Sequence, residues 1–148
     1  MTSETAMNRK KHQMDPAEKE ILTGRIRSFL ETECPEIVAA YLFGSFTENR
    51  SFSDVDIGIL LREAPQKPLE VEFKLENDLE RILKLPVDVR ILNKAPLSFC
   101  FTVIRQKEII IDRDSDFRVD FESYTLKKYF DFAPFRRRYL AEVENAEI

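Results

Sequence analysis

The pattern of hydrophobic and polar positions along the chain predicts four helical stretches. Apolar residues recur at helical spacing after Asp15-Pro16, and an acidic cap followed by proline is typical of a helix start. Pro35 ends this first helix. The other helices are expected over residues 69–85, 96–104 and about 116–144, the last with a kink or break at Pro134.

Short segments between these helices are typical of strands. The first, IVAAYLF, is almost wholly apolar and predicts a buried strand, whereas DVDIGILL and VDVRIL alternate and predict strands with two different faces. The strands are expected at 37–43, 54–61, 87–92 and 108–111. This order of elements favours an α/β or α+β fold, a small mixed β-sheet flanked by helices with a C-terminal helical extension.

This organisation divides the chain into three parts. Residues 1–14 are expected to form a flexible arm, residues 15–115 the folded domain, and residues 116–148 a helical segment. The last segment holds half of the aromatic side chains, interleaved with lysine and arginine. Aromatic and arginine side chains are typical interface anchors, so we expect part of this helix to dock a protein partner, although it could equally complete the domain's own core.

Composition narrows the possible functions. The chain has 148 residues, about one domain, with 43% hydrophobic and 34% charged residues and a net charge of −4. The acidic balance makes direct nucleic-acid binding an unfavoured function, and no apolar run is long enough to span a bilayer. His12 is the only histidine, which disfavours Ser–His or Cys–His catalysis. Two widely spaced cysteines, Cys34 and Cys100, suggest reduced thiols and a cytoplasmic location.

Carboxylates on two of the predicted strands are candidates for metal binding. Asp54 and Asp56 lie two positions apart, so both point to one face of their strand. Two such close charges repel each other unless a proton or a cation offsets them, and hard oxygen ligands suit Mg²⁺ or Mn²⁺. Asp88 supplies a third carboxylate from another strand, and the three converge if the strands are neighbours.

A possible phosphate-binding turn precedes the acidic pair. Gly44 and Ser45 directly follow the apolar strand, where glycine permits close approach of a ligand to the backbone. The serine hydroxyl and the free amides of the next turn can bind phosphate. The sequence therefore predicts a nucleoside triphosphate held between this turn and metal ions on the three acids.

Three segments carry a resemblance to a known family. LFGSF, SDVDIGILL and PVDVRIL resemble the minimal nucleotidyltransferases of the DNA polymerase β-like superfamily over most of residues 15–115. The tail SYTLKKYFDFAPFRRRYL resembles the antitoxin members encoded beside HEPN-domain toxins. The resemblance implies a nucleotidyltransferase fold, ATP as donor, Mg²⁺ as cofactor and transfer of AMP to a tyrosine of the toxin.

The resemblance also implies roles for single residues. Gly44 and Ser45 match the positions that grip the triphosphate, Asp54 and Asp56 match the metal-binding pair, and Asp88 matches the third acid. The sequence departs from the family where Thr47-Glu48-Asn49 stands in place of a segment with a basic residue. Two other functions remain open: a non-catalytic module that neutralises its partner by docking, and nucleotidyl transfer to a small molecule.

Overall fold

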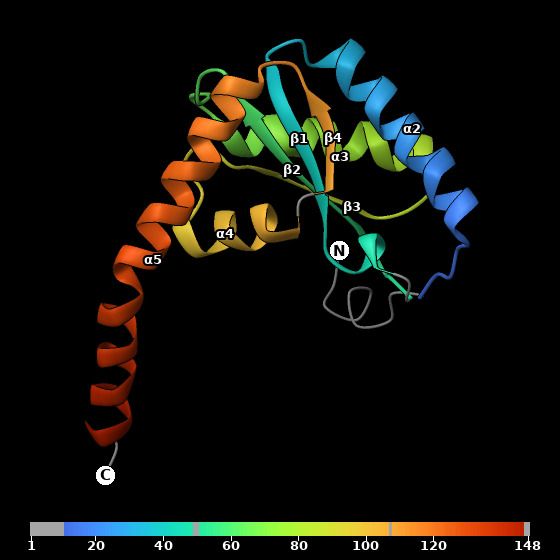
Figure 1. Cartoon of the computed structure of the whole chain (residues 1–148). Coiled ribbons are helices and arrows are strands. Elements are labelled where there is room, and N and C mark those ends of the chain that lie inside the picture. The colour runs from blue at the N-terminus through green and yellow to red at the C-terminus, as the bar shows by residue number, and fades with distance from the viewer. Residues whose placement is uncertain (1–10, 49–50, 107, 147–148) are drawn as a thin grey trace.

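The protein folds around one mixed four-stranded sheet with helices on both faces (Figure 1). This computed structural model describes residues 11–48, 51–106 and 108–146. The strands are β1 (Ile37–Phe43), β2 (Val55–Leu61), β3 (Val87–Ile91) and β4 (Glu108–Asp112), and the helices are α2 (Pro16–Glu33), η1 (Ser45–Thr47), α3 (Pro68–Leu83), α4 (Leu97–Gln106) and α5 (Ser115–Ala146). The strand order is β3-β2-β1-β4. The expected α+β architecture is therefore confirmed.

Strand directions decide which residues meet at one end of the sheet. β1 runs antiparallel to both β2 and β4, whereas β2 and β3 run parallel. The carboxyl end of β1 therefore lies beside the amino ends of β2 and β3. The Gly-Ser turn and the acidic residues of the sequence fall at these three strand ends.

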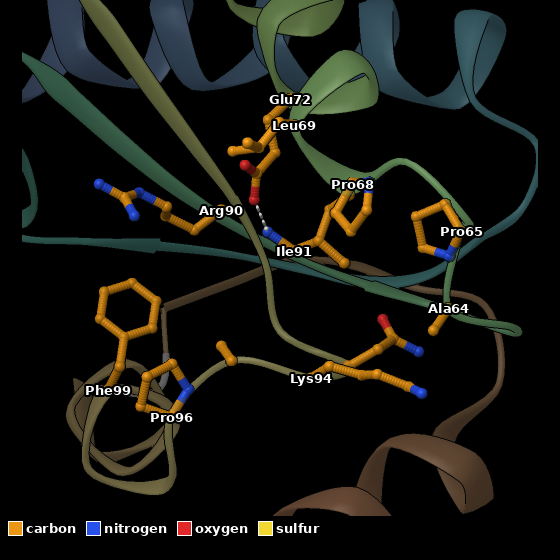
Figure 2. A pocket seen from close by; sticks show the side chains of 12 residues that line it. Ala64, Pro65, Pro68, Leu69, Glu72, Arg90, Ile91, Lys94, Pro96 and Phe99 are labelled. Carbon is orange, nitrogen blue, oxygen red and sulfur yellow. Dashed lines mark hydrogen bonds between the residues drawn. The ribbon is translucent and has the colours of Figure 1, made fainter.

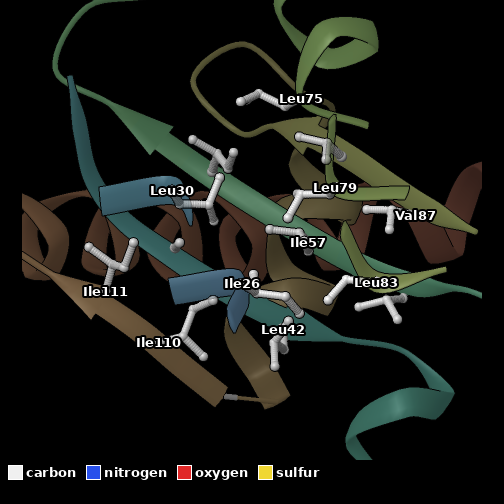
Figure 3. Close-up of a cluster of buried hydrophobic side chains, with 14 of the residues drawn as sticks. Ile26, Leu30, Leu42, Ile57, Leu75, Leu79, Leu83, Val87, Ile110 and Ile111 are labelled. Carbon is white, nitrogen blue, oxygen red and sulfur yellow. The ribbon is translucent and has the colours of Figure 1, made fainter. Parts of the chain in front are cut away.

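Each face of the sheet has its own hydrophobic core. On one face α2 and α3 pack against the sheet through residues that include Ile26, Leu30, Leu79 and Ile57, all fully buried (Figure 3). On the other face α4 and the first turns of α5 cover β1 and β2. Alternation along β2 and β3 sends the valines and isoleucines to the first core and Asp56 and Asp88 to the second face.

Some element boundaries match the predicted ones, and others differ. Asp15 caps α2 as expected, with its Oδ1 accepting from the Glu18 amide at 2.8 Å. β2 begins at Val55, so Asp54 lies in the bend before the strand. α5 continues through Pro134 without the predicted break. Residues 1–10 of the expected arm lie outside the described residues.

The end of the expected arm is instead part of the fold. The backbone of His12 pairs with that of Phe52 through two hydrogen bonds, of 2.8 and 3.1 Å. Met14 packs against the larger hydrophobic core. The loop before β2 is therefore held on one side by this short extended segment.

The first half of α5 also belongs to the domain. Phe117 and Phe121 pack against the second core, and Thr125 is only 2% exposed. The hydroxyl of the fully buried Tyr41 donates a 2.7 Å hydrogen bond to Glu122. A boundary at residue 115 would cut through this packing, and Figure 1 shows only the distal half of α5 projecting from the body.

Two glutamates of α3 cover the free edge of β3. The amides of Val89 and Ile91 each donate a 2.8 Å hydrogen bond, to Glu76 and Glu72 respectively. The spacing of four residues places both carboxylates on one side of the helix. The edge strand is thereby closed to pairing with another chain.

Replacing Glu76 tests how much its hydrogen bond to the edge strand stabilises the fold. Burial raises the pKa of Glu76, and the negative charge of Asp88 adds to the shift. Glu76→Ala leaves the Val89 amide without its acceptor and should lower the free energy of unfolding by about 1–3 kcal/mol. Glu76→Gln keeps an acceptor oxygen and removes the partly buried charge, so it should match or exceed the wild type at neutral pH.

The pH dependence gives the control for this prediction. Since folding raises the pKa of Glu76, its contribution is fully present below the ordinary value of 4.5 and is lost as pH rises through the folded value. In urea titrations between pH 4 and 7, the free energy of unfolding of Glu76→Gln should rise relative to that of the wild type as the pH increases. A constant difference would contradict this account.

Candidate active site

The turn after β1 places a glycine against an acidic side chain. Gly44 has φ of +79°, in the region that favours glycine. A Cβ added to Gly44 would collide with the Asp56 carboxylate. The backbone conformation therefore favours glycine here, and a larger residue would also have to displace the Asp56 carboxylate.

The sheet register brings the second and third acids together. Asp56 pairs with Phe43 on one side and with Asp88 on the other. Paired residues of parallel neighbours point to the same face, so Asp56 and Asp88 lie side by side. The site thus runs across the sheet from Gly44 over Asp56 to Asp88.

The donor set of the acids fits a hard divalent cation. Asp54, Asp56 and Asp88 are all partly exposed, and carboxylate oxygens are the ligands that Mg²⁺ and Mn²⁺ prefer. Within the described ranges, no three Asp, Glu, His or Cys side chains already form a metal-binding group. The three predicted ligands are therefore not gathered around one point in this structure, although the sheet register places Asp56 beside Asp88.

Arg90 holds Asp88 in its present orientation. Its Nε lies 3.2 Å from Oδ1 of Asp88, and the two residues share a face of β3. The side chains are 57% and 36% exposed, so solvent weakens this ion pair. A divalent cation on Asp88 would compete with Arg90 for the same carboxylate.

Two buried phenylalanines and a lysine of α2 hold the loop between the Gly44 turn and β2. Phe46 and Phe52 are buried and pack edge to face, with ring centroids 4.9 Å apart. Lys19 of α2 lies 5.5 Å from each ring centroid, and its Nζ donates to the Glu48 carbonyl at 2.6 Å. These contacts fix both ends of the described part of the loop, while residues 49–50 lie outside it.

Gln106 is a site residue that the sequence did not indicate. Its Oε1 accepts from the Gly44 amide at 2.9 Å and lies 3.4 Å from the Thr47 hydroxyl oxygen. The Thr47 hydroxyl also donates to the Gly44 carbonyl at 2.8 Å. Gln106 ends α4, 62 residues from Gly44, and no motif marks it. Tyr41 precedes the same turn in the sequence, but its side chain is buried in the core and offers no surface on which a nucleotide base could stack.

A glycine turn beside in-register carboxylates on a mixed sheet defines a nucleotidyltransferase type of site. A sequence model of the polymerase beta nucleotidyltransferase family matches residues 25–116, more than half of the chain. The chain therefore belongs to this family, and the resemblance carried by its three motifs is confirmed at that level. No curated protein matches the chain in sequence.

Several solved structures share the fold. The MNT antitoxin complex of a tri-AMPylated Shewanella oneidensis HEPN toxin matches with a TM-score of 0.72 at 22% identity, over 85% of this chain and 98% of that chain. The MntA–HepT toxin–antitoxin complex gives 0.70 at 22% identity, covering 84% and 98%. A toxin–antitoxin complex with AMP-PNP gives 0.72 at 23% identity, covering 82% and 98%. At these identities the similarity establishes a common fold.

Among the described residues, no helix is both long and apolar enough to cross a membrane.

Cys34 and Cys100 are buried, unpaired thiols. Burial raises the pKa of Cys100 to about 11, so this thiol is not activated for nucleophilic chemistry. Neither cysteine belongs to the candidate site.

Proposed function

We propose that the chain is a Mg²⁺-dependent nucleotidyltransferase that silences a HEPN-type toxin by transferring AMP from ATP to a toxin tyrosine. The observation that carries this proposal is the line of Gly44, Asp56 and Asp88 across three adjacent strands. Similar folds occur in complexes with an AMPylated HEPN toxin and with AMP-PNP, which supports the choice of partner and donor. A cytoplasmic location, where ATP is present and thiols stay reduced, fits this function.

The proposed reaction is an in-line displacement at the α-phosphorus of ATP. The tyrosine oxygen forms a bond to this phosphorus, the bond to the pyrophosphate oxygen breaks, and the electron pair leaves with pyrophosphate. The hydroxyl proton passes to the Asp88 carboxylate and then to solvent. Gly44 and Ser45 bind the leaving phosphates, and Asp54, Asp56 and Asp88 would hold the divalent ions. Such ions supply charge stabilisation in this class of reaction.

The distal part of α5 is the surface we assign to the toxin. Beyond its packing on α4, this helix exposes large apolar side chains: Phe132, Phe135, Tyr139, Leu140 and Val143. We call these five residues the distal patch. Apolar surface of this kind, flanked by the basic run 136–138, is typical of a protein-binding site.

A non-catalytic antitoxin is the second candidate. The loop has Thr47 and Glu48 where the family resemblance predicts a basic residue, and an acid near phosphates weakens their binding. In that case docking of the distal patch alone would inhibit the toxin. The two candidates share the same partner and differ in whether the toxin is covalently changed.

Co-expression with the HEPN-type toxin separates these candidates. Toxin recovered from the complex should carry added AMP by intact-mass spectrometry, and it should stay inactive after the antitoxin is removed. Inhibition that disappears on separation, with the toxin mass unchanged, would instead favour the binding module. A toxin that is neither bound nor modified would contradict both.

Gln106 gives a prediction at the phosphate-binding turn. Gln106→Ala removes the acceptor of the Gly44 amide, and the lost hydrogen bond costs about 1 kcal/mol. The loosened turn should raise the KM for ATP by roughly fivefold, with a smaller change in kcat. Steady-state kinetics measure this split. A lowered KM would show that Gln106 competes with phosphate rather than positioning the turn.

A further inference from the structure

Asp88 lies close to other negative charges and therefore needs a positive partner. In the sheet it is paired with Asp56, and the charge of Asp88 also reaches the carboxyl group of Glu76 on α3. Neighbouring carboxylates repel each other unless a proton or a cation offsets their charge. The sequence predicts a divalent ion in this role, and the structure supplies a side chain for it.

Arg90 is this positive side chain. Its Nε donates to Oδ1 of Asp88 at 3.2 Å. The charge of Asp88, and more weakly those of Glu72 and Glu76, raises the pKa of Arg90, so its guanidinium stays charged. One oxygen of Asp88 is therefore engaged by a cationic donor of the same strand.

The contact with Arg90 sets Asp88 apart from the other predicted metal ligands. Asp54 precedes β2 at its amino end, whereas Arg90 lies two residues beyond Asp88, toward the carboxyl end of the parallel strand β3. A divalent ion at the same oxygen of Asp88 would lie beside the guanidinium, and two positive charges so close together repel each other. The ion and Arg90 therefore exclude each other at this oxygen.

Arg90 has space to move away from Asp88. It lines a cavity of about 340 Å³ at the free edge of β3, together with Phe99 and Glu72 (Figure 2). Glu72 accepts from the Ile91 amide with one oxygen, and a carboxylate has capacity for further donors. An aromatic face and a carboxylate both attract a guanidinium. The cavity can therefore receive the side chain when it leaves Asp88.

We propose that Arg90 is a positioning residue that occupies Asp88 in the metal-free protein and moves into the cavity when a divalent ion binds. Arg90 thereby sets the metal concentration at which Asp88 joins Asp54 and Asp56 in one site. This inference rests on the proposed function, because that function makes Asp88 a metal ligand. It does not depend on the identity of the acceptor.

Metal binding to the protein alone tests this exchange without any transfer reaction. Mn²⁺ is titrated into the whole chain without nucleotide, and the free ion is counted by electron paramagnetic resonance. Because Arg90→Gln removes the competing partner of an exposed ion pair, it should tighten Mn²⁺ binding by about threefold to fivefold. The same affinity in the wild type and the variant would overturn the proposal.

Arg62→Gln is the matched control for the change in net charge. Arg62 pairs with Asp114 at 3.1 Å, and the two side chains are 58% and 33% exposed, against 57% and 36% for Arg90 and Asp88. Arg62 follows the carboxyl end of β2, remote from Asp56 near the amino end. The control should bind Mn²⁺ within about 1.5-fold of the wild type. A gain equal to that of Arg90→Gln would assign the effect to net charge and overturn the proposal.

Asp88→Asn separates the contact from a general effect of the positive charge. This substitution removes the carboxylate for which Arg90 and the metal compete, and it should weaken Mn²⁺ binding. In the Asp88→Asn background, Arg90→Gln should change the affinity by less than about 1.5-fold. An equal gain in both backgrounds would overturn the proposal.

The same titrations distinguish this inference from the proposed function. If neither the wild type nor Arg90→Gln binds Mn²⁺, both the exchange and the metal-dependent function are wrong. If Mn²⁺ binding follows the expected pattern but no AMP reaches the toxin, the proposed function is wrong and the role of Arg90 stands.

Discussion

Asp56→Asn should abolish nucleotide transfer while leaving the protein folded. Asp56 lies between Gly44 and Asp88 at the point where the strands place phosphate and carboxylates together. The substitution removes one charge from the set that would hold the divalent ions, and loss of such electrostatic stabilisation costs about 4 kcal/mol in the transition state, or about 10³-fold in rate. A single-turnover assay of AMP transfer to the toxin measures this loss.

The fold should tolerate Asp56→Asn because the side chain is partly exposed and belongs to neither core. Thermal unfolding of the variant checks this point. Asp120→Asn, at an exposed position on the domain half of α5, is the matched control and should keep activity within about twofold. If Asp56→Asn transfers AMP at close to the wild-type rate, the assignment of the site is wrong.

Charged substitutions in the distal patch should separate the antitoxin from its toxin. Phe135 and Tyr139 are 62% and 65% exposed, and they lie four residues apart on one side of α5. Because buried aromatic anchors contribute about 2 kcal/mol or more each, the double variant Phe135→Glu, Tyr139→Glu should weaken the complex by about 10³-fold. Isothermal titration calorimetry with the toxin measures this change directly.

A truncation gives the same test in another form. Ending the chain after Asp131 removes the distal patch but keeps Phe117, Phe121 and Glu122 on the second core. Removal of all residues from 116 onward would also remove this packing, so its result would mix folding with docking. Ile21→Glu on α2, 61% exposed, is the control for an added surface charge. Unchanged affinity in the double variant would exclude the patch as the toxin-binding surface.

Much of this architecture follows from local sequence signals. Asp15-Pro16 marks the start of α2, the apolar run before Gly44 marks a buried strand, and alternation places Asp88 on a strand face. These signals depend only on neighbouring residues, and the structure bears them out. Whether Asp56 and Asp88 meet depends on strand order, which periodicity does not encode; the parallel pairing of β2 and β3 supplies it.

Features that depend on distant contacts were not predictable in this way. Gln106 reaches Gly44 only because α4 ends beside the turn, and the edge-covering role of Glu72 and Glu76 depends on how α3 packs along β3. Pro134 predicted a kink or break, and α5 has no break there. The aromatic segment fits neither predicted role alone, because its first half packs on the core whereas its second half is exposed.

Transfer of label from ATP to the toxin tests the central claim most directly. Purified protein, Mg²⁺ and HEPN-type toxin are incubated with ATP radiolabelled either at the α-phosphate or at the γ-phosphate. The account predicts labelled toxin only with the α-labelled nucleotide, and none when Asp56→Asn replaces the wild type. Label from the γ-phosphate, or no label on a toxin that is nevertheless inhibited, would contradict nucleotidyl transfer by this site.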